Sequence, residues 1–405
     1  MSNVMDRAAL GIKVVELCNF IAGPYCARLL ADFGAEVVKI EPPGSGDDAR
    51  HRGPFPEDQP HPETSGTFLY LNTDKQSVTL DLQKPDGREV FKRLIADADV
   101  LIEDRAPGEM ERLGLGYEAL RAINPSLIVT SITPFGQEGP YRDYKAHHLN
   151  IYHASGQGYL LPMWAPNLDN APVKGPGYLG EYDGGMAGAI ATLAALFWRG
   201  NGGTGQHIDI SKQHAMFQLE RSQLRRYVDT GASPNRTGKG RLLESLVECK
   251  DGFAVVILSS QSQWEGLYEA MGRPEWGARA PFNTQAGRSA HYQELRQHLA
   301  EWARTLTVEE LFHSVQKHRT ACAPIQTAEQ IYASSQFRAR DYFEEIDHPV
   351  AGKFEYPGNP FRLSNTPRPP RHPAPLLGQH NEAVYCGRLG YSQSDLVKLA
   401  QARVI

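Results

Sequence analysis

The feature that most constrains this chain is an alternation of short apolar runs with helix-like segments across its first third. Residues 12–17 and 36–40 are compact apolar runs, and between them Gly23-Pro24 opens a helical segment that Gly34 ends. Pro is tolerated in the first turn of a helix, and Gly favours its C-terminal end. The pattern recurs as helices at 87–96 and 117–123 followed by strands at 100–103 and 127–132. This alternation predicts an α/β fold with a mostly parallel sheet covered by helices.

The later part of the chain indicates a second, smaller domain. Residues 232–240 form a Pro/Gly/Asn-rich linker, and Asp251-Gly252 between two apolar runs is a strong hairpin signal. A chain of 405 residues is also too long for one ordinary core. We therefore predict a Rossmann-like large domain at residues 1–229, a smaller α+β domain at 230–325, and a proline-rich C-terminal strap at 326–405 that returns to the large domain.

The composition excludes several classes of function. The formal net charge of −5 argues against nucleic acid or a polybasic membrane surface as the main partner. The longest apolar run, 186–198, is shorter than the ~20 residues that a membrane span needs, so we expect a buried helix there. The five cysteines are scattered and form no CxxC, which favours reduced thiols in a cytoplasmic protein and argues against a bound metal.

The segment 177–186 carries two acids among glycines, just before the apolar helix expected at 185–199. A carboxylate near the start of a helix lies close to unpaired backbone N–H groups and the positive end of the helix dipole. We interpret Asp183 as the N-cap of that helix. Glu181 lies further out in a glycine-bordered loop, where a bulky substrate could approach closely. A solvated loop glutamate with no functional role would give the same sequence pattern.

A series of short motifs runs in order along nearly the whole chain. They are residues 23–24 (GP), 34–41 (GAEVVKIE), 44–47 (GSGD), 71–75 (LNTDK), 107–108 with 111–114 (PG, ERLG), 134–136 with 139–141 (PFG, GPY), 204–211 (TGQHIDIS) and 376–380 (LLGQH). In these motifs the chain resembles the class III CoA-transferase family, which includes formyl-CoA transferase, carnitine-CoA transferase and α-methylacyl-CoA racemase. The resemblance implies an interlocked dimer that acts on acyl-CoA and a carboxylic acid, with no permanently bound cofactor.

The resemblance also implies a mechanism and its residues. A carboxylate at the position of Glu181 attacks the acyl-CoA thioester, and the released CoA thiolate then forms an enzyme-bound thioester that an acceptor acid discharges. The family's transferases carry Asp there, so Glu181 has the same chemistry with one more methylene. Coenzyme A carries several phosphate charges, and the expected CoA-binding residues are Ala22, Leu71, Asn72, Lys75, Arg105, Arg112 and Lys145.

Three other readings stay open at this point. The first is an α-methylacyl-CoA racemase or isomerase, because His147 aligns with the catalytic His of the racemases and could act with Glu181 on opposite faces of an α-carbon. The second is one subunit of a hetero-oligomer whose homologous partner supplies the Asp. The third is a dinucleotide-dependent dehydrogenase, which residues 19–24 disfavour because they contain no GxGxxG. Residues 159–164 could line an acyl pocket or simply belong to the core.

Overall fold

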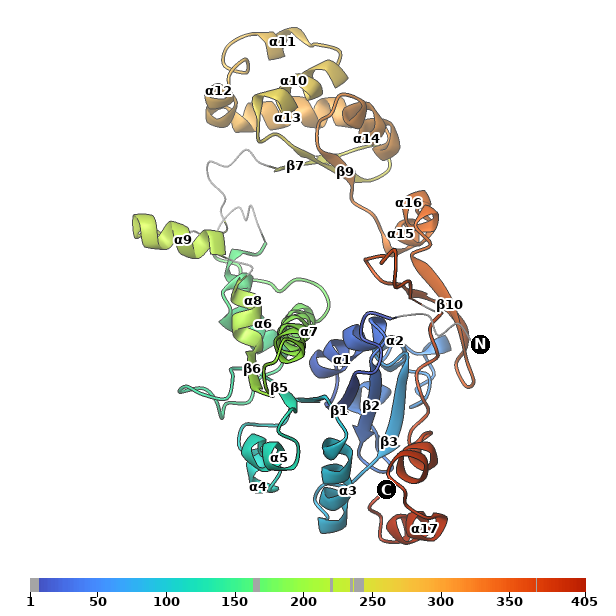
Figure 1. Cartoon of the computed structure of the whole chain (residues 1–405). Coiled ribbons are helices and arrows are strands. Elements are labelled where there is room, and N and C mark those ends of the chain that lie inside the picture. Colours follow the sequence, from blue (N-terminus) through green and yellow to red (C-terminus); the bar gives the residue numbers. More distant parts are fainter. Residues whose placement is uncertain (1–6, 163–167, 219–220, 234–235, 237–243, 369) are drawn as a thin grey trace. The chain divides into compact units, whose positions relative to one another are not determined.

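The computed structural model describes residues 7–162, 168–218, 221–233, 236, 244–368 and 370–405 (Figure 1). It divides into two compact units. The first comprises Met1–Leu161, Pro172–Pro234 and Asp341–Ile405, and the second comprises Pro162–Ala171 and Asn235–Arg340. The second unit therefore includes residues 326–340, which the sequence analysis assigned to the C-terminal strap.

The first unit is built on a six-stranded sheet in which all neighbouring strands are parallel. Its strands are β1 (Lys13–Leu17), β2 (Glu36–Glu41), β3 (Lys75–Thr79), β4 (Val100–Glu103), β5 (Ile128–Thr133) and β6 (His207–Ser211). They lie in the order β3-β2-β1-β4-β5-β6, which is that of doubly wound nucleotide-binding folds. The predicted mixed α/β architecture with a parallel sheet is confirmed.

Apolar side chains on both faces of this sheet are covered, which gives three layers. Successive strand residues point to opposite faces, so Val14 joins one apolar cluster and Val15 the other. One face is covered by α1 (Ala22–Asp32) and α7 (Leu179–Gly200), which lie side by side in Figure 1. The other face is covered by α3 (Pro85–Ala96), α4 (Glu109–Arg112) and α5 (Tyr117–Ile123).

The remaining elements of the first unit are short. They are α2 (Gly66–Leu71), α6 (His148–Ala154), α8 (Lys212–Phe217), α9 (Arg221–Thr230), α17 (Gln393–Gln401), the 3-10 turns Asp48–His51, Pro56–Asp58 and Gln157–Leu160, the π-helical turn Ala383–Arg388, and the antiparallel hairpin of β10 (Phe343–His348) and β11 (Gly352–Pro357). This hairpin is not predicted from the sequence, because its strands carry four acidic residues and no clear apolar alternation.

The segment that follows the hairpin runs along the edge strand β3. The backbone N–H of Ser77 donates to His380 Nδ1 (3.2 Å), and the N–H of His380 donates to the Ser77 carbonyl (2.9 Å). Further along, the N–H of Thr79 donates to Asn381 Oδ1 (2.9 Å), and the Tyr385 hydroxyl donates to the Thr79 carbonyl (2.8 Å). These bonds satisfy β3 groups that an exposed sheet edge would leave unpaired.

The second unit has its own core around a small antiparallel sheet. The sheet order is β7-β8-β9, formed by β7 (Glu244–Glu248), β8 (Phe253–Ile257) and β9 (Cys322–Pro324). Its helices are α10 (Gln261–Ala270), α11 (Glu275–Ala278), α12 (Gln285–Ala290), α13 (Tyr292–Ala303), α14 (Val308–Lys317), α15 (Ala328–Ala333) and α16 (Ser335–Ala339). The Asp251-Gly252 hairpin lies where the sequence predicts it.

Helix α7 begins six residues before the start expected from the sequence, at Leu179, and its glycines explain why. A Cβ added to Gly185 would lie 2.5 Å from the carbonyl oxygen of Ala22, and one on Gly188 would lie 2.9 Å from Ile132. These glycines therefore let the helix backbone come against α1 and β5, and that packing outweighs the poor helix propensity of glycine. In the part of the chain that the structure describes, no helix, α7 included, is long and apolar enough to cross a membrane.

This packing yields a stability prediction. Gly185→Ala places a methyl group against the α1 backbone, so we expect the free energy of unfolding to fall by about 1–3 kcal/mol. Gly200→Ala, at the other end of the same helix, is the control, because an added Cβ there meets nothing within 4 Å. It should leave stability unchanged or raise it by up to ~1 kcal/mol. Urea unfolding followed by near-UV circular dichroism measures both, and equal effects would contradict the close packing.

Candidate active site

The carboxyl ends of β1 and β4 mark the topological switch point of the sheet, where ligands of such folds usually bind. The two loops are joined there, because the N–H of Asn19 donates to Asp104 Oδ2 (2.8 Å). Phe20 has a left-handed backbone (φ 68°) that its N–H stabilises by donating to Asp47 Oδ1 (2.9 Å). Burial raises the pKa of Asp104 to about 6. The hydrogen bonds from the Asn19 and Phe20 N–H groups therefore hold the loop after β1 in a backbone conformation that most residues avoid.

Glu181 lies in the first turn of α7 and only 6% of its surface is exposed. The prediction that it lies in a loop is wrong, as is the prediction that Asp183 is the N-cap. The N-cap is Tyr178, which makes no side-chain capping bond, and Asp183 is the fifth residue of the helix. Glu181 therefore has the position near free N–H groups that we expected of an acid in this segment. Burial raises the pKa of Asp183.

The carboxylate of Glu181 is paired with an ammonium that the sequence analysis missed. Lys212 Nζ lies 2.8 Å from Glu181 Oε2 and 3.1 Å from Oε1. Lys212 opens α8 directly after β6, and its stem passes α7 where a Cβ on Gly184 would be 2.7 Å from Lys212 Cγ. The carboxyl ends of parallel strands meet at one edge of a sheet, so a cation directly after β6 was the available signal.

Two histidines precede this region, and the structure separates their environments. His147 is exposed, and its N–H donates to Asn150 Oδ1 (3.0 Å) at the start of α6. His148 is 6% exposed, and neither ring nitrogen has a hydrogen-bond partner among the described residues. Its ring packs edge-on to Tyr178 with centroids 5.4 Å apart, and burial lowers its pKa. The histidine beside α7 is therefore His148, not the His147 that the racemase alignment indicated.

Lys75, expected to contact CoA, is instead part of a buried ionic cluster. Its ammonium lies 2.7 Å from Glu16 Oε2 and also donates to the Pro24 carbonyl (2.8 Å) and Asn72 Oδ1 (3.0 Å). Glu16 accepts from Lys39 as well (2.7 Å), and burial lowers the pKa of Lys75 to about 8. With three acceptors already around it, the Lys75 ammonium has no donor left for a phosphate. Its observed contacts hold β1, β3 and α1 together.

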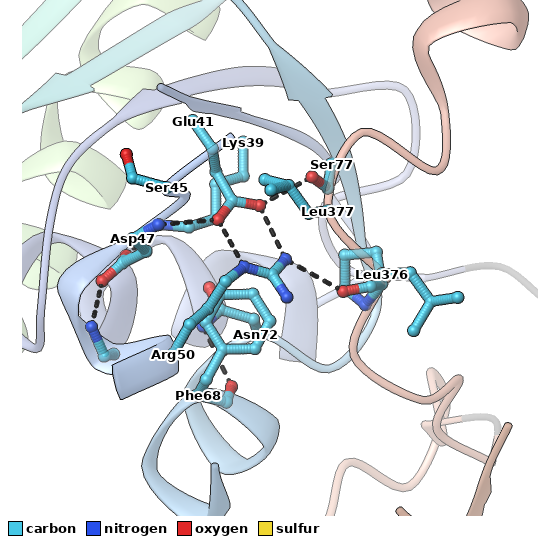
Figure 2. Close-up of polar contacts among 12 residues, drawn as sticks. Lys39, Glu41, Ser45, Asp47, Arg50, Phe68, Asn72, Ser77, Leu376 and Leu377 are labelled. Atoms are coloured by element: carbon cyan, nitrogen blue, oxygen red, sulfur yellow. Dashed lines mark hydrogen bonds and ion pairs between the residues drawn. The ribbon is translucent and has the colours of Figure 1, made fainter. Parts of the chain in front are cut away.

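A second buried cluster fixes the loop after β2 and the C-terminal segment (Figure 2). The Arg50 guanidinium donates to both oxygens of Glu41, at 2.7 and 2.8 Å, and to the Pro375 carbonyl (3.1 Å). Glu41 Oε1 also accepts from Ser77 (2.6 Å), and the ring of Phe68 lies under the guanidinium. These charged contacts hold the pKa of Glu41 below its usual value against the opposing effect of burial.

The other expected CoA-binding residues differ in how accessible they are. Ala22, Leu71 and Asn72 are buried at the ends of α1 and α2. Arg105 is half-buried after β4, whereas Arg112 and Lys145 are exposed. Arg142, which the sequence analysis did not select, lies with Arg112 beside Gly108, because a Cβ there would be 3.7 Å from an Nη atom of each.

A cavity opens on the opposite face of the sheet from α7, beside α4 and α5. It is lined by Glu103, Arg105, Tyr117, Ser131 and His207 among others. The Ser131 hydroxyl and His207 Nε2 are 2.8 Å apart, and burial raises the pKa of Glu103 to about 7. Glu181 does not line this cavity.

Among the described residues, no group of three or more His, Cys, Asp or Glu could hold a metal ion. Of the acyl-pocket segment predicted at 159–164, residues 163 and 164 lie outside the described residues, and Tyr159 is exposed.

Comparisons with known proteins agree over nearly the whole chain. Residues 10–381 match the model of CoA-transferase family III. A succinyl-CoA–D-citramalate CoA-transferase of Chloroflexus aurantiacus is 34% identical over 400 residues, covering 97% of each chain. A formyl-CoA:oxalate CoA-transferase of Rhodopseudomonas palustris is 30% identical over 420 residues, covering 98% of this chain and 96% of its own.

Solved structures show the same likeness. A CaiB/BaiF family protein from Brucella suis superposes with a TM-score of 0.81 at 31% identity, covering 94% of this chain and 99% of its own. A protein from Mycobacterium tuberculosis superposes with a TM-score of 0.80 at 27% identity, covering 93% and 98% respectively.

Proposed function

Because the chain belongs to CoA-transferase family III, we propose that it moves CoA from an acyl-CoA to a carboxylic acid through a covalent intermediate on Glu181. The observation that carries this proposal is the placement of the Glu181 carboxylate, buried in the first turn of α7 beside Lys212. Two named relatives transfer CoA to D-citramalate and to oxalate, so we propose a small carboxylic acid as acceptor.

The proposed reaction uses the carboxylate as a nucleophile in two halves. A Glu181 oxygen attacks the thioester carbonyl, the C–S bond breaks, and the electron pair leaves with CoA thiolate. The thiolate attacks the Glu181 carbonyl of the mixed anhydride and releases the donor acid. The acceptor carboxylate then attacks the glutamyl thioester, and the thiolate freed in that step takes the acceptor acyl group. The start of α7 is the positive end of the helix dipole, which suits the developing oxyanion.

For CoA itself, we propose that the phosphates bind to exposed arginines at the carboxyl end of the sheet. Arg112 and Arg142 lie together beside Gly108, and Arg105 lies close by in sequence at the end of β4. Arginine suits phosphate because its planar fork gives paired hydrogen bonds. We also propose Lys145 as a CoA-binding residue, because its side chain is exposed and positively charged. The other four expected residues are buried, so we propose that they support the CoA site without contacting the phosphates; they are Ala22, Leu71, Asn72 and Lys75.

We also propose that the protein works as an interlocked homodimer, as the family resemblance implies, with a hetero-oligomer of homologous subunits as the alternative. The racemase alternative has weaker support, because His147 is exposed and caps α6. A racemase would exchange the substrate α-hydrogen with deuterium from solvent, whereas the proposed transfer leaves that hydrogen in place.

The nucleophile is tested by Glu181→Gln. This variant should lose turnover and the covalent CoA adduct that intact-mass spectrometry detects after incubation with acyl-CoA, because an amide is a poor nucleophile. Asp183→Asn, two residues away on the same helix, is the matched control and should keep both, since Asp183 caps nothing. Both variants should show circular dichroism spectra like the wild type. Full activity in folded Glu181→Gln would reject the covalent mechanism at this residue.

The phosphate contacts are tested by Arg112→Gln and Arg142→Gln. Each change removes a charge-assisted hydrogen bond of about 1.5–3 kcal/mol, so the CoA dissociation constant should rise about tenfold or more by calorimetry. The control is Arg121→Gln, an exposed arginine on α5 that pairs only loosely with Glu118 (3.7 Å). If all three variants bind CoA as the wild type does, the phosphates lie elsewhere.

A further inference from the structure

The Glu181–Lys212 pair raises a problem of charge that the proposed reaction must solve. The side chain of Lys212 is 12% exposed and that of Glu181 is 7% exposed. Both ammonium contacts found in the described part of the chain go to the two Glu181 oxygens. A largely buried cation that loses its partner is costly, because little water can replace the lost charge. The ammonium therefore needs another anion whenever Glu181 is neutral.

Glu181 is neutral in every covalent stage of the proposed reaction. Its carboxylate becomes an anhydride, then a thioester, then a second anhydride, and each of these carries no charge. The Lys212 ammonium then faces a side chain that carries no charge. Two other groups face the ammonium, but neither replaces Glu181 as a direct partner. Asp104 interacts with the ammonium only electrostatically, with no ion pair or hydrogen bond between them among the described residues, and one of its oxygens accepts from the Asn19 N–H. His148 offers no negative charge, and burial lowers its pKa. The stem of Lys212 lies against Gly184, which keeps its Cβ, Cγ and Cδ atoms beside α7.

We propose that Lys212 binds the carboxylate of the acid substrate whenever Glu181 is in a covalent anhydride or thioester stage. This inference rests on the proposed function. In the first half of the reaction, the donor acid leaves the anhydride as a carboxylate and takes the place of Glu181 at the ammonium. In the second half, the acceptor carboxylate binds there before one of its oxygens attacks the Glu181 thioester. The ammonium returns to Glu181 when the acceptor acyl group leaves with CoA. Lys212 changes partner and no proton is transferred.

This role places the acid substrate beside the reacting carbonyl. The Lys212 ammonium lies within hydrogen-bond distance of both Glu181 oxygens, so an anion bound to it lies next to the Glu181 carbonyl carbon. Such an arrangement supplies proximity for the attack. It also restricts the second substrate to molecules with a carboxylate, since a neutral alcohol or amine would leave the ammonium unpaired. Lys212 is therefore a specificity-determining residue for the acid and not for CoA.

The experiment loads the protein with CoA from an acyl-CoA, removes excess reagent, and follows discharge of the adduct by increasing acceptor concentration. In Lys212→Met the adduct should still form, and the acceptor concentration for half-maximal discharge should rise at least tenfold. The KM for acyl-CoA should change less than threefold, and Lys212→Arg should restore much of the acceptor affinity. Lys92→Met, on the surface of α3 and paired with Glu89, controls for the change in net charge.

A second measurement uses the wild type, in case Lys212→Met does not fold. Nitrate, a planar anion like a carboxylate, should compete with the acceptor and be uncompetitive with acyl-CoA, because its site exists only after Glu181 is acylated. If Lys212→Met discharges with unchanged acceptor dependence, or if nitrate competes with acyl-CoA, Lys212 does not bind the acid. If the wild type forms no adduct at all, the proposed covalent mechanism fails before this inference is reached.

Discussion

The rest of this site depends on the close contact that glycines allow along α7. With a Cβ at Gly185 the helix would meet the α1 backbone, and with one at Gly184 it would meet the stem of Lys212. Only without these side chains can the first turn of α7 lie beside both the switch point of the sheet and α8. The carboxylate of Glu181 and the ammonium of Lys212 are brought within 2.8 Å as a consequence of that backbone contact.

Buried charges hold the surrounding loops in place, and they do so through contacts that span the chain. Glu16 of β1 pairs with Lys39 of β2 and with Lys75 of β3, and these three strands are neighbours in the sheet. Arg50 joins Glu41 to the carbonyl of Pro375, so the C-terminal segment is fixed to the loop after β2 (Figure 2). Removing one partner of such a cluster leaves an uncompensated buried charge. These charges therefore link β1, β2 and β3 to one another, to the loop after β2 and to the C-terminal segment.

The sequence predicts those parts of this structure that depend on local patterns. Buried parallel strands are continuous apolar runs, so residues 12–17 and 36–40 were recognisable as strands. The start of α7 could not be recognised in this way, because a glycine-rich segment resembles a loop until the elements that pack against it are known. The burial of Lys75 and the pairing of Lys212 depend on partners far away in the sequence. The position of Lys212 directly after β6 places it at the carboxyl edge of the sheet, but nothing local identifies its partner, and no local signal distinguishes Lys75 from a surface cation. Family resemblance supplied Glu181 as the nucleophile candidate, but could not supply its counter-ion.

The most direct test of the covalent mechanism follows oxygen atoms. An acceptor acid labelled with 18O in its carboxylate gives one of its oxygens to Glu181 in each turnover, because the second anhydride breaks on the acceptor side. After turnover with acyl-CoA, proteolysis and tandem mass spectrometry should find 18O in the side chain of Glu181 and not in that of Asp183. Turnover that leaves Glu181 unlabelled would contradict the account, since CoA would then reach the acceptor without a covalent stage on this residue.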